Sequence, residues 1–230
     1  MRVDTTQEEP RKPIRSYVLR QGRLSPAQRR ACDDLFPLYG VPFSTTVVDW
    51  AAIFGRVAPV VLEIGFGMGE TTAAIADAHR EMDFVAVDVH LPGIGALLNR
   101  IDTLHLTNVR VIRHDAVEVV STMTAKSSLA AIHVYFPDPW PKKRHHKRRL
   151  LKPDFVHALA QRLVPRGYLH VATDWREYAE DVLATMSAEP LLVNTTAGFA
   201  ERPQWRPLTK FEARGQKLGH EVFDLVFARS

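Results

Sequence analysis

The sequence predicts an α/β fold with a mainly parallel seven-stranded sheet, helices on both faces and one antiparallel strand near the C-terminus. From about residue 57 onward, short apolar segments alternate with longer helix-like segments, which is typical of βαβ units. Residues 58–65, APVVLEIG, are mostly apolar, as expected of a strand buried on both faces. The last two apolar segments have no helix-like segment between them, so at least one of them should run antiparallel.

The elements follow in order from local signals. Ser25 and Pro26 are typical of a helix start and predict a helix to about residue 36, followed by a loop over 37–46. The apolar segments predict strands over residues 58–65, 84–89, 109–116, 129–138, 167–174, 191–196 and 221–228. The helices between them are predicted over residues 69–80, 92–106, 153–165 and 175–186. We expect Pro165 and Gly167 to end the third of these.

The composition is that of one globular domain. Of the 230 residues, 46% are apolar and 24% are charged, which is ordinary for a globular protein with a full core. Residues 1–24 are polar and basic, with two prolines. We therefore predict a flexible N-terminal arm over 1–24 and a single domain over 25–230.

The chain lacks the sequence signals of a membrane or secreted protein. No apolar run approaches the roughly 18 residues that span a bilayer, and the N-terminus lacks the apolar core of a signal peptide. Cys32 is the only cysteine, which excludes an internal disulfide and a cysteine zinc cluster. We expect a cytoplasmic protein with no membrane partner and no metal site.

A glycine-rich loop follows the first predicted strand. Gly65, Gly67 and Gly69 let the backbone turn sharply and let a ligand approach closely. Their GxGxG spacing differs from the GxGxxG loop that seats a pyrophosphate. The preceding Glu63 disfavours a pyrophosphate and favours a cationic ligand. S-adenosylmethionine carries an ammonium and a sulfonium group and no phosphate, so it fits; a glycine-rich turn without a ligand is the alternative.

Four further carboxylates lie at the ends of predicted strands: Asp88, Asp115, Asp138 and Asp174. Asp88 is placed to accept hydrogen bonds from ribose hydroxyls, as in NAD sites, or else to cap the next helix. Asp115 is placed either near an adenine amino group or in a turn. Because the carboxyl ends of parallel strands share one edge of the sheet, these groups need cationic or hydrogen-bonding partners. A cationic nucleoside cofactor and a base would supply them.

The segment Lys142–Arg149, KKRHHKRR, follows directly after Pro-Asp-Pro-Trp-Pro. Its six Lys/Arg residues repel one another, so the run costs stability unless an anion binds it. Arg and Lys bind phosphates well, and an RNA backbone needs this many cations where one small phosphate does not. A solvated surface loop is the alternative. Thr209–Glu212, TKFE, could hydrogen-bond and stack on a base, or form an ordinary loop.

Taken together, these residues resemble the tRNA (guanine-N7-)-methyltransferases, which have the Rossmann-like class I methyltransferase fold. The resemblance covers about residues 35–229 and is carried by LEIGFGMGE, VAVDVHLPGIG, PDPWPKKRHHKRR, HVATD and LTKFEARG, in that order. Many methyltransferases share the first block. The PDPW-plus-basic block with TKFE downstream is far more specific. Two departures are Asp88, where relatives often carry Glu, and Pro141, where relatives can carry His.

The resemblance implies a reaction and a set of site residues. The reaction is methyl transfer from S-adenosylmethionine to guanine N7 in the tRNA variable loop, at position 46 in tRNA numbering, forming 7-methylguanosine. Asp138 would be catalytic. The implied cofactor contacts are Glu63, Gly65, Gly67, Gly69, Asp88, Asp115 and Asp138. The implied substrate contacts are Lys142, Asp174, Thr209, Lys210, Phe211 and Glu212. The side chains implied to face RNA are Arg144, His145, His146, Lys147, Arg148 and Arg149.

The chemistry agrees with the residues, although other functions stay open. Guanine N7 carries a lone pair and no hydrogen, so its attack on a methyl group needs no general base. The alternatives are methylation of another RNA base or of an exocyclic amine, a nicotinamide-dependent Rossmann enzyme, and a non-catalytic RNA-binding subunit. We expect tRNA as the partner, no obligatory protein partner, and a monomer or homodimer.

Overall fold

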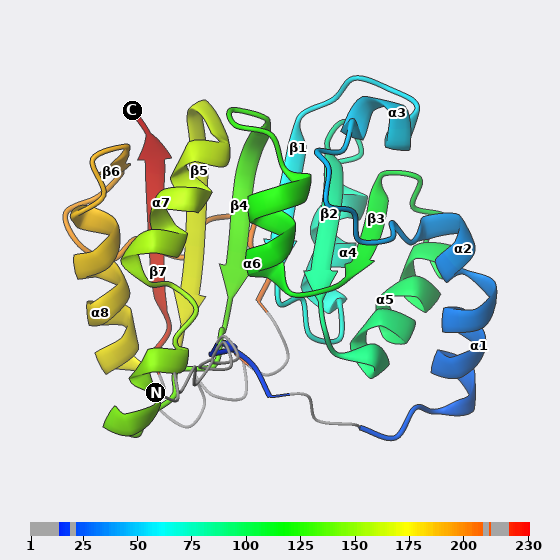
Figure 1. Cartoon of the computed structure of the whole chain (residues 1–230), viewed down its shortest axis with the longest axis horizontal. Helices are drawn as coiled ribbons and strands as arrows, with labels where there is room; N and C mark the ends of the chain where they lie inside the picture. The colour runs from blue at the N-terminus through cyan, green and yellow to red at the C-terminus, as the bar shows by residue number, and fades with distance from the viewer. Residues whose placement is uncertain (1–13, 19–21, 209–211, 213–220) are drawn as a thin grey trace, which may run out of the picture.

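The computed structural model describes residues 14–18, 22–208, 212 and 221–230. Its centre is a seven-stranded sheet with the strand order β3-β2-β1-β4-β5-β7-β6 (Figure 1). The strands are β1 Val60–Ile64, β2 Asp83–Asp88, β3 Val109–Arg113, β4 Leu129–Tyr135, β5 Leu163–Thr173, β6 Leu192–Asn194 and β7 Phe223–Arg229. The order reverses between β1 and β4, and ligands of open α/β sheets bind at the carboxyl ends beside such a reversal.

The strand directions confirm the predicted mixed sheet. β1 pairs in parallel with β2 and with β4, so that Val61 lies opposite Phe84 and Ala131. β7 pairs antiparallel with both β5 and β6. β6 therefore runs in the direction of the other strands, and β7 is the antiparallel strand that the sequence predicts near the C-terminus. In Figure 1, β4 and β5 point downward and β7 points upward.

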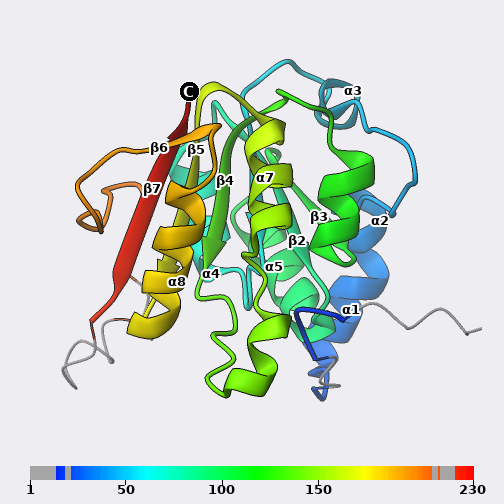
Figure 2. The same cartoon turned by 60° about the vertical axis from the view of Figure 1, so that its left-hand side comes forward.

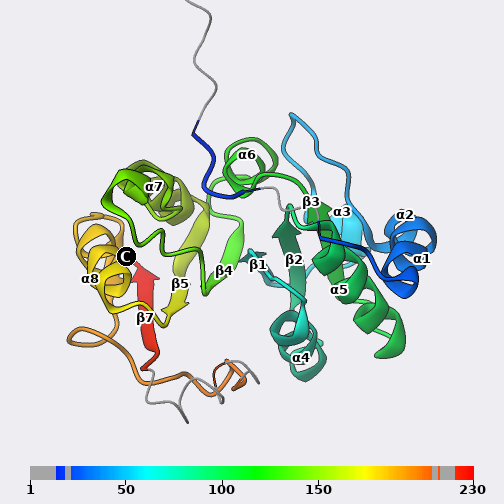
Figure 3. The same cartoon turned by 90° about the horizontal axis from the view of Figure 1, so that it is seen from below.

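Helices cover both faces of the sheet. They are α1 Pro26–Asp34, α2 Phe36–Tyr39, α3 Trp50–Phe54, α4 Glu70–Ala78, α5 Leu91–Thr103, α6 Ala116–Glu118, α7 Pro153–Arg162 and α8 Arg176–Ser187. A π-helical turn, η1 Val119–Met123, and a 3₁₀ helix, η2 Lys143–Arg148, complete them. The core beneath one face includes side chains from α3, η1, α7 and α8, and the core beneath the other includes side chains from α1, α4 and α5 (Figures 2 and 3). None of the helices within the described ranges is long and apolar enough to cross a bilayer.

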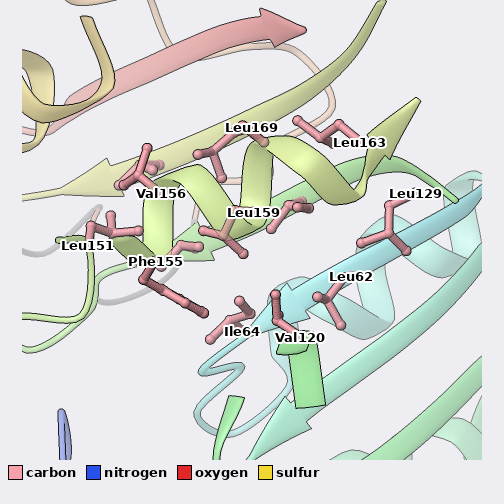
Figure 4. Close-up of a cluster of buried hydrophobic side chains, with 14 of the residues drawn as sticks. Leu62, Ile64, Val120, Leu129, Leu151, Phe155, Val156, Leu159, Leu163 and Leu169 are labelled. Carbon is pink, nitrogen blue, oxygen red and sulfur yellow. The ribbon is translucent and has the colours of Figure 1, made fainter. Parts of the chain in front are cut away.

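The larger core lies between α7 and the sheet (Figure 4). Leu62 and Ile64 of β1 belong to this core together with Phe155 and Leu159 of α7. Because side chains alternate between the faces of a strand, Glu63 lies between them on the opposite face. This alternation places an acidic residue under the covering of α4 and α5 rather than under α7.

The chain departs from the predicted boundaries where α7 meets β5. The sequence predicts a helix to Pro165, but α7 ends at Arg162 and β5 begins at Leu163. Pairing with β4 jumps from Leu129 opposite Leu163 to Ala131 opposite Tyr168. Pro165 therefore lies in an irregular stretch of the strand, where its missing N–H breaks no regular ladder. A second departure is α2, which forms at the start of the predicted loop over 37–46.

Candidate functional site

The glycine-rich loop connects β1 to α4 at the carboxyl edge of the sheet. Gly65, Gly67 and Gly69 have φ angles of 76°, 58° and 72°. Residues with a Cβ rarely adopt this left-handed region. A Cβ on Gly69 would approach Leu97 to 2.7 Å, and a Cβ on Gly93 would approach the carbonyl oxygen of Gly67 to 2.0 Å. The loop therefore packs directly on α5, and its conformation requires glycine.

Asp88 fixes the outer side of this loop. Its Oδ2 accepts a hydrogen bond from the Gly67 N–H at 3.0 Å, and its Oδ1 accepts one from the His90 N–H at 2.9 Å. Burial raises the pKa of the Asp88 carboxyl. The residue thus ends β2 as predicted, and one carboxylate joins the glycine loop to the start of α5.

A pocket opens where the strand order reverses. Asp88 and Asp138 both line it. The other lining residues come from the ends of β1, β2 and β3, from the loop after β4 and from the N-terminal segment: Ser16, Tyr17, Ile64, Gly65, Val87, Val89, His114, Ala116, Phe136, Pro137 and Leu150. Three of the predicted cofactor residues, Gly65, Asp88 and Asp138, therefore line one pocket although they lie at or after the ends of separate strands. The other four, Glu63, Gly67, Gly69 and Asp115, are not among its lining residues.

Glu63 does not line the pocket, although the next two residues, Ile64 and Gly65, do. Its side chain is buried, and Oε2 has no hydrogen-bond partner within the described ranges. Burial raises the pKa of Glu63 to about 7. A buried carboxyl of this kind is largely protonated below neutral pH unless a cation or a donor approaches it.

The end of β3 leads into His114 and Asp115. Asp115 caps α6 by accepting a hydrogen bond from the Val117 N–H at 2.9 Å. The His114 ring stacks on Phe43 with ring centroids 3.7 Å apart and pairs with Glu118. The local turn role that the sequence left open for Asp115 is therefore present, and Asp115 still lies at the carboxyl edge of the sheet.

The loop after β4 presents Asp138 at the pocket. Phe136 and Trp140 flank it with φ angles of 51° and 47°, in the left-handed region that bulky residues rarely adopt. Each such residue costs about 1–3 kcal/mol, and strain of this kind clusters at functional sites. Asp138 itself is exposed. Within the described part of the chain, its carboxylate makes no hydrogen bond or ion pair.

The basic run forms the 3₁₀ helix η2, with Lys142 preceding it as the N-cap residue. Arg144 and Lys147 are exposed, and the Arg148 guanidinium lies 5.2 Å from the ring centroid of Trp140. Arg149 differs, because its side chain is only 4% exposed. The run therefore has an outer cationic surface and one inward-pointing arginine.

Arg149 is bound inside the protein. It forms ion pairs at 3.0 Å with Glu177 and with Asp181 of α8, and its Nε donates to the Pro139 carbonyl oxygen at 3.0 Å. These contacts attach the loop that carries Asp138 to α8. The resemblance implied that Arg149 faces RNA. In the structure its guanidinium instead pairs with Glu177 and Asp181 inside the protein.

The residues implied to contact substrate lie in different environments. Asp174 follows β5 and is exposed, on the same edge of the sheet as Asp138. Glu212 is buried, and both of its carboxylate oxygens accept hydrogen bonds from Arg206, at 2.7 and 2.8 Å. Thr209, Lys210 and Phe211 lie outside the described residues.

Sequence reasoning missed a buried polar network under the C-terminal segment. Arg206 also pairs with Asp224 of β7, and Asp224 accepts a hydrogen bond from His170 Nε2 at 2.7 Å. The Tyr135 hydroxyl and the Trp205 Nε1 lie 3.0 and 3.3 Å from the other ring nitrogen of His170, Nδ1. Because an indole N–H only donates, His170 Nδ1 accepts, and the proton resides on Nε2. Burial lowers the pKa of His170, which agrees with this neutral tautomer.

A sequence signal for this network exists. His133 and Tyr135 alternate with apolar residues along β4, and Tyr168 and His170 do so along β5. Polar residues at every second position of a central strand mark a face that a helix does not cover. The segment after β6 (orange in Figure 3) runs past this face, on the side that carries α4.

Comparisons with known proteins agree on one family. A family model described as "Putative methyltransferase" matches residues 57–225. The tRNA (guanine-N(7)-)-methyltransferase of Nitrosospira multiformis is 58% identical over 97% of this chain and 97% of its own length. The enzyme of the same name from Nitrosomonas eutropha is 59% identical over 95% of this chain and 97% of its own.

This chain belongs to the tRNA (guanine-N7-)-methyltransferase family. The resemblance that the motifs indicate is thereby confirmed. Solved structures add the fold: a crystal structure of the 16S rRNA methyltransferase KamB has a TM-score of 0.58 at 18% identity, covering 80% of this chain and 94% of that one. At this identity the likeness establishes the class I methyltransferase fold alone.

The pocket fits the cofactor of this methyltransferase family, S-adenosylmethionine. Its described lining includes two carboxylates and no Lys or Arg, which suits a cation without phosphates. Asp88 lines the pocket, and a carboxylate at the end of the second strand is the kind of group that accepts hydrogen bonds from ribose hydroxyls. Glu63, two positions before Gly65, has one buried oxygen without a hydrogen-bond partner among the described residues. These acceptor groups therefore suit the charge and the sugar of this cofactor.

Proposed function

We propose that this chain transfers a methyl group from S-adenosylmethionine to N7 of guanine in the variable loop of tRNA, at position 46, forming 7-methylguanosine. The observation that carries the proposal is the arrangement of Asp138 between the acidic pocket and the cationic surface of η2. The relatives named tRNA (guanine-N(7)-)-methyltransferase over nearly the whole chain support the same reaction. We propose a cytoplasmic enzyme that works as a monomer or homodimer.

The residues divide the work between two sides of Asp138. On one side, Asp88 and the glycine loop hold the cofactor, which supplies a methyl group on a positively charged sulfur. On the other side, η2 holds RNA phosphates, mainly through Arg144, Lys147 and Arg148. Alignment of the reacting atoms accounts for on the order of 7–11 kcal/mol in such reactions.

Asp138 acts where positive charge develops. Guanine N7 needs no general base, but the methylated base becomes cationic, and a nearby carboxylate favours it electrostatically. The same carboxylate is also placed to accept hydrogen bonds from the donor edge of guanine. Bringing the base out of its stack costs a few kcal/mol, which the phosphate contacts of η2 offset. Lys142 and Asp174 are proposed to contact the tRNA beside Asp138. Thr209, Lys210 and Phe211 are proposed as further tRNA contacts, whereas Glu212 is buried against Arg206 and is not.

The proposal is tested with purified protein, S-adenosylmethionine and an unmodified tRNA transcript. Mass spectrometry of the digested nucleosides should show 7-methylguanosine and no other new methylated nucleoside. A transcript with 7-deazaguanosine at the proposed position should accept no methyl group, because it lacks the N7 lone pair. Methylation of an exocyclic amine, or unchanged methylation of the 7-deaza transcript, would refute the proposal.

Asp138→Asn tests the role of the carboxylate. Turnover should fall by at least about 100-fold, a decrease typical of removing one electrostatic stabiliser, while the melting temperature stays that of the wild type. Asp154→Asn, an exposed acidic residue in the first turn of α7, serves as the control. Near-normal single-turnover rates in a folded Asp138→Asn protein would remove Asp138 from catalysis.

A further inference from the structure

The segment 14–18 contributes two residues to the cofactor pocket, although no sequence motif assigns this part of the chain a site role. Ser16 and Tyr17 line the pocket together with Asp88, His114 and Asp138. In Figure 3, the dark blue segment passes beside α6 at the end of the sheet where the strands terminate. The first described residues of the chain therefore form part of a wall that the α/β core alone would leave open.

Trp140 holds this segment in place. Its indole Nε1–H donates a hydrogen bond to the Ser16 carbonyl oxygen at 3.1 Å, across 124 positions of sequence. Trp140 has a φ angle of 47°, a conformation that must be compensated by contacts elsewhere. The hydrogen bond to Ser16 is one such contact.

The Trp140 ring makes separate contacts with η2. Its edge-to-face partner His145 lies 5.8 Å away between ring centroids, and the Arg148 guanidinium lies 5.2 Å from the ring centroid. These contacts use the π-system, whereas the contact with Ser16 uses the N–H. A phenylalanine at this position keeps the ring contacts with η2 and removes the hydrogen bond to Ser16.

Tyr17 occupies the side of the pocket near the end of β3. It lines a cleft with Val89, His114 and Asp115, and the Arg15 guanidinium lies 5.6 Å from its ring centroid. Burial raises the pKa of the Tyr17 hydroxyl, and the Asp115 carboxylate adds to the effect. The tyrosine therefore stays neutral and presents an aromatic ring beside Asp88, where a nucleoside would lie.

We propose that residues 14–18 are the outer wall of the cofactor pocket, with Tyr17 in contact with the bound nucleoside and Trp140 as the positioning residue that holds the wall. This rests on the proposed function in that the pocket binds S-adenosylmethionine. The N-terminal segment thereby retains the cofactor. The tryptophan of the PDPW motif acts on the cofactor through Ser16 and not by touching the reacting atoms.

The test measures binding of S-adenosylmethionine to the full chain without tRNA. Trp140→Phe should release the cofactor about 3- to 10-fold faster in stopped-flow experiments, which corresponds to the removal of one hydrogen bond. Binding of tRNA to the cofactor-free protein should change by less than about twofold, because the ring contacts with η2 remain. Trp50→Phe is the matched control: its buried indole nitrogen has no partner within the described ranges, so cofactor release should stay at the wild-type rate.

A second variant shows whether Trp140 acts through the wall. Tyr17→Ala should weaken cofactor affinity about 10-fold by calorimetry, as expected when an aromatic ring that stacks on a base is removed. Adding Trp140→Phe to it should weaken binding little further. Wild-type cofactor binding in Tyr17→Ala, or fully additive effects in the double variant, would overturn the proposal. These readouts need no methyl transfer, so a wild-type protein that makes no 7-methylguanosine would refute the proposed function and leave this result standing.

Discussion

Asp88 and Glu63 are both predicted cofactor residues, but the structure buries them to different degrees. Asp88 is partly exposed and holds two backbone N–H groups, from Gly67 and His90. Glu63 is buried on the inner face of β1, with one oxygen unpaired among the described residues. The sequence predicts both as cofactor residues, whereas in the structure Asp88 lines the pocket and Glu63 does not.

Asp88→Ala should weaken S-adenosylmethionine binding by about 1.5–3 kcal/mol, the cost of removing hydrogen bonds to a charged acceptor. Affinity for tRNA should stay nearly unchanged, because η2 lies apart from β2 in the chain and makes its own contacts. Calorimetry measures the first quantity and filter binding the second. Asp88→Asn keeps one oxygen acceptor and can retain only one of the two backbone hydrogen bonds, so it should weaken binding by less than Asp88→Ala. Unchanged cofactor affinity in Asp88→Ala would exclude Asp88 from the site.

Glu63 predicts a pH dependence of stability. Its pKa is about 7 in the folded protein against an ordinary value of 4.5, so between these pH values the folded state binds a proton that the unfolded state has released. The unfolding free energy should therefore decrease as pH rises through this window, by roughly 3 kcal/mol from this group.

Urea denaturation of the cofactor-free protein measures the effect. It is carried out at about pH 5 and at about pH 8, because most of the range between the two pKa values lies between them. Glu63→Gln should lack the corresponding part of the pH dependence, whereas the exposed Glu201→Gln should keep it. If the unfolding free energy of the wild type and that of Glu63→Gln change by the same amount between the two pH values, burial does not hold Glu63 neutral.

At the scale of an element, η2 turns a run of like charges into two functional surfaces. The consecutive basic residues repel one another, and the 3₁₀ helix points successive side chains in different directions. Arg149, just after it, points inward to Glu177 and Asp181, and Arg148 lies over the Trp140 ring. The outward cations are the ones available to bind phosphates, so the surface that we propose for RNA binding is smaller than the run.

Replacing Arg144, Lys147 and Arg148 by Gln should weaken tRNA binding strongly and leave cofactor affinity unchanged. Each phosphate contact that the variant no longer makes should reduce the slope of log affinity against log salt by roughly 0.7–0.9. Lys126→Gln with Arg166→Gln is the control, because both are exposed cations and Arg166 lies near the opposite end of β5. A triple variant with wild-type affinity and salt slope would move the RNA site elsewhere.

At the scale of the whole molecule, the C-terminal segment is attached to the sheet by charge. Arg206 is 1% exposed and binds Glu212 and Asp224 with paired hydrogen bonds, and Asp224 continues to His170 of β5. These contacts cover the part of the sheet that α4 and α5 do not reach. They also place Glu212 in the interior, so we expect its first role to be holding its segment against the sheet.

Arg206→Met should lower the unfolding free energy by about 3–5 kcal/mol, because two buried carboxylates are left without their guanidinium partner. The exposed Arg202→Met, in the same segment, should cost less than about 1 kcal/mol. Chemical denaturation followed by circular dichroism and by tryptophan fluorescence measures both. A decrease below about 1 kcal/mol in Arg206→Met would show that the network adds little to stability.

The sequence by itself determined the sheet, the glycine loop, the carboxylates at the strand ends and the family. These depend on local patterns: the alternation of strands and helices, the GxGxG spacing and the order of the motifs. Its boundaries were less accurate where long-range pairing decides them, as at Pro165, which an irregular stretch of pairing accommodates inside β5. The 3₁₀ helix of the basic run had no local signal either.

Only the tertiary structure decided what each polar group contacts. Arg149 and Arg148 are neighbours of the same type, yet one pairs with α8, some 30 positions away, and the other lies over Trp140. Trp140 reaches Ser16 across 124 positions, and the His170 tautomer depends on Trp205 and Asp224. The physical reason is that hydrogen bonds and burial act at short distance in space. Partners far apart in the chain meet only when the whole sheet has formed.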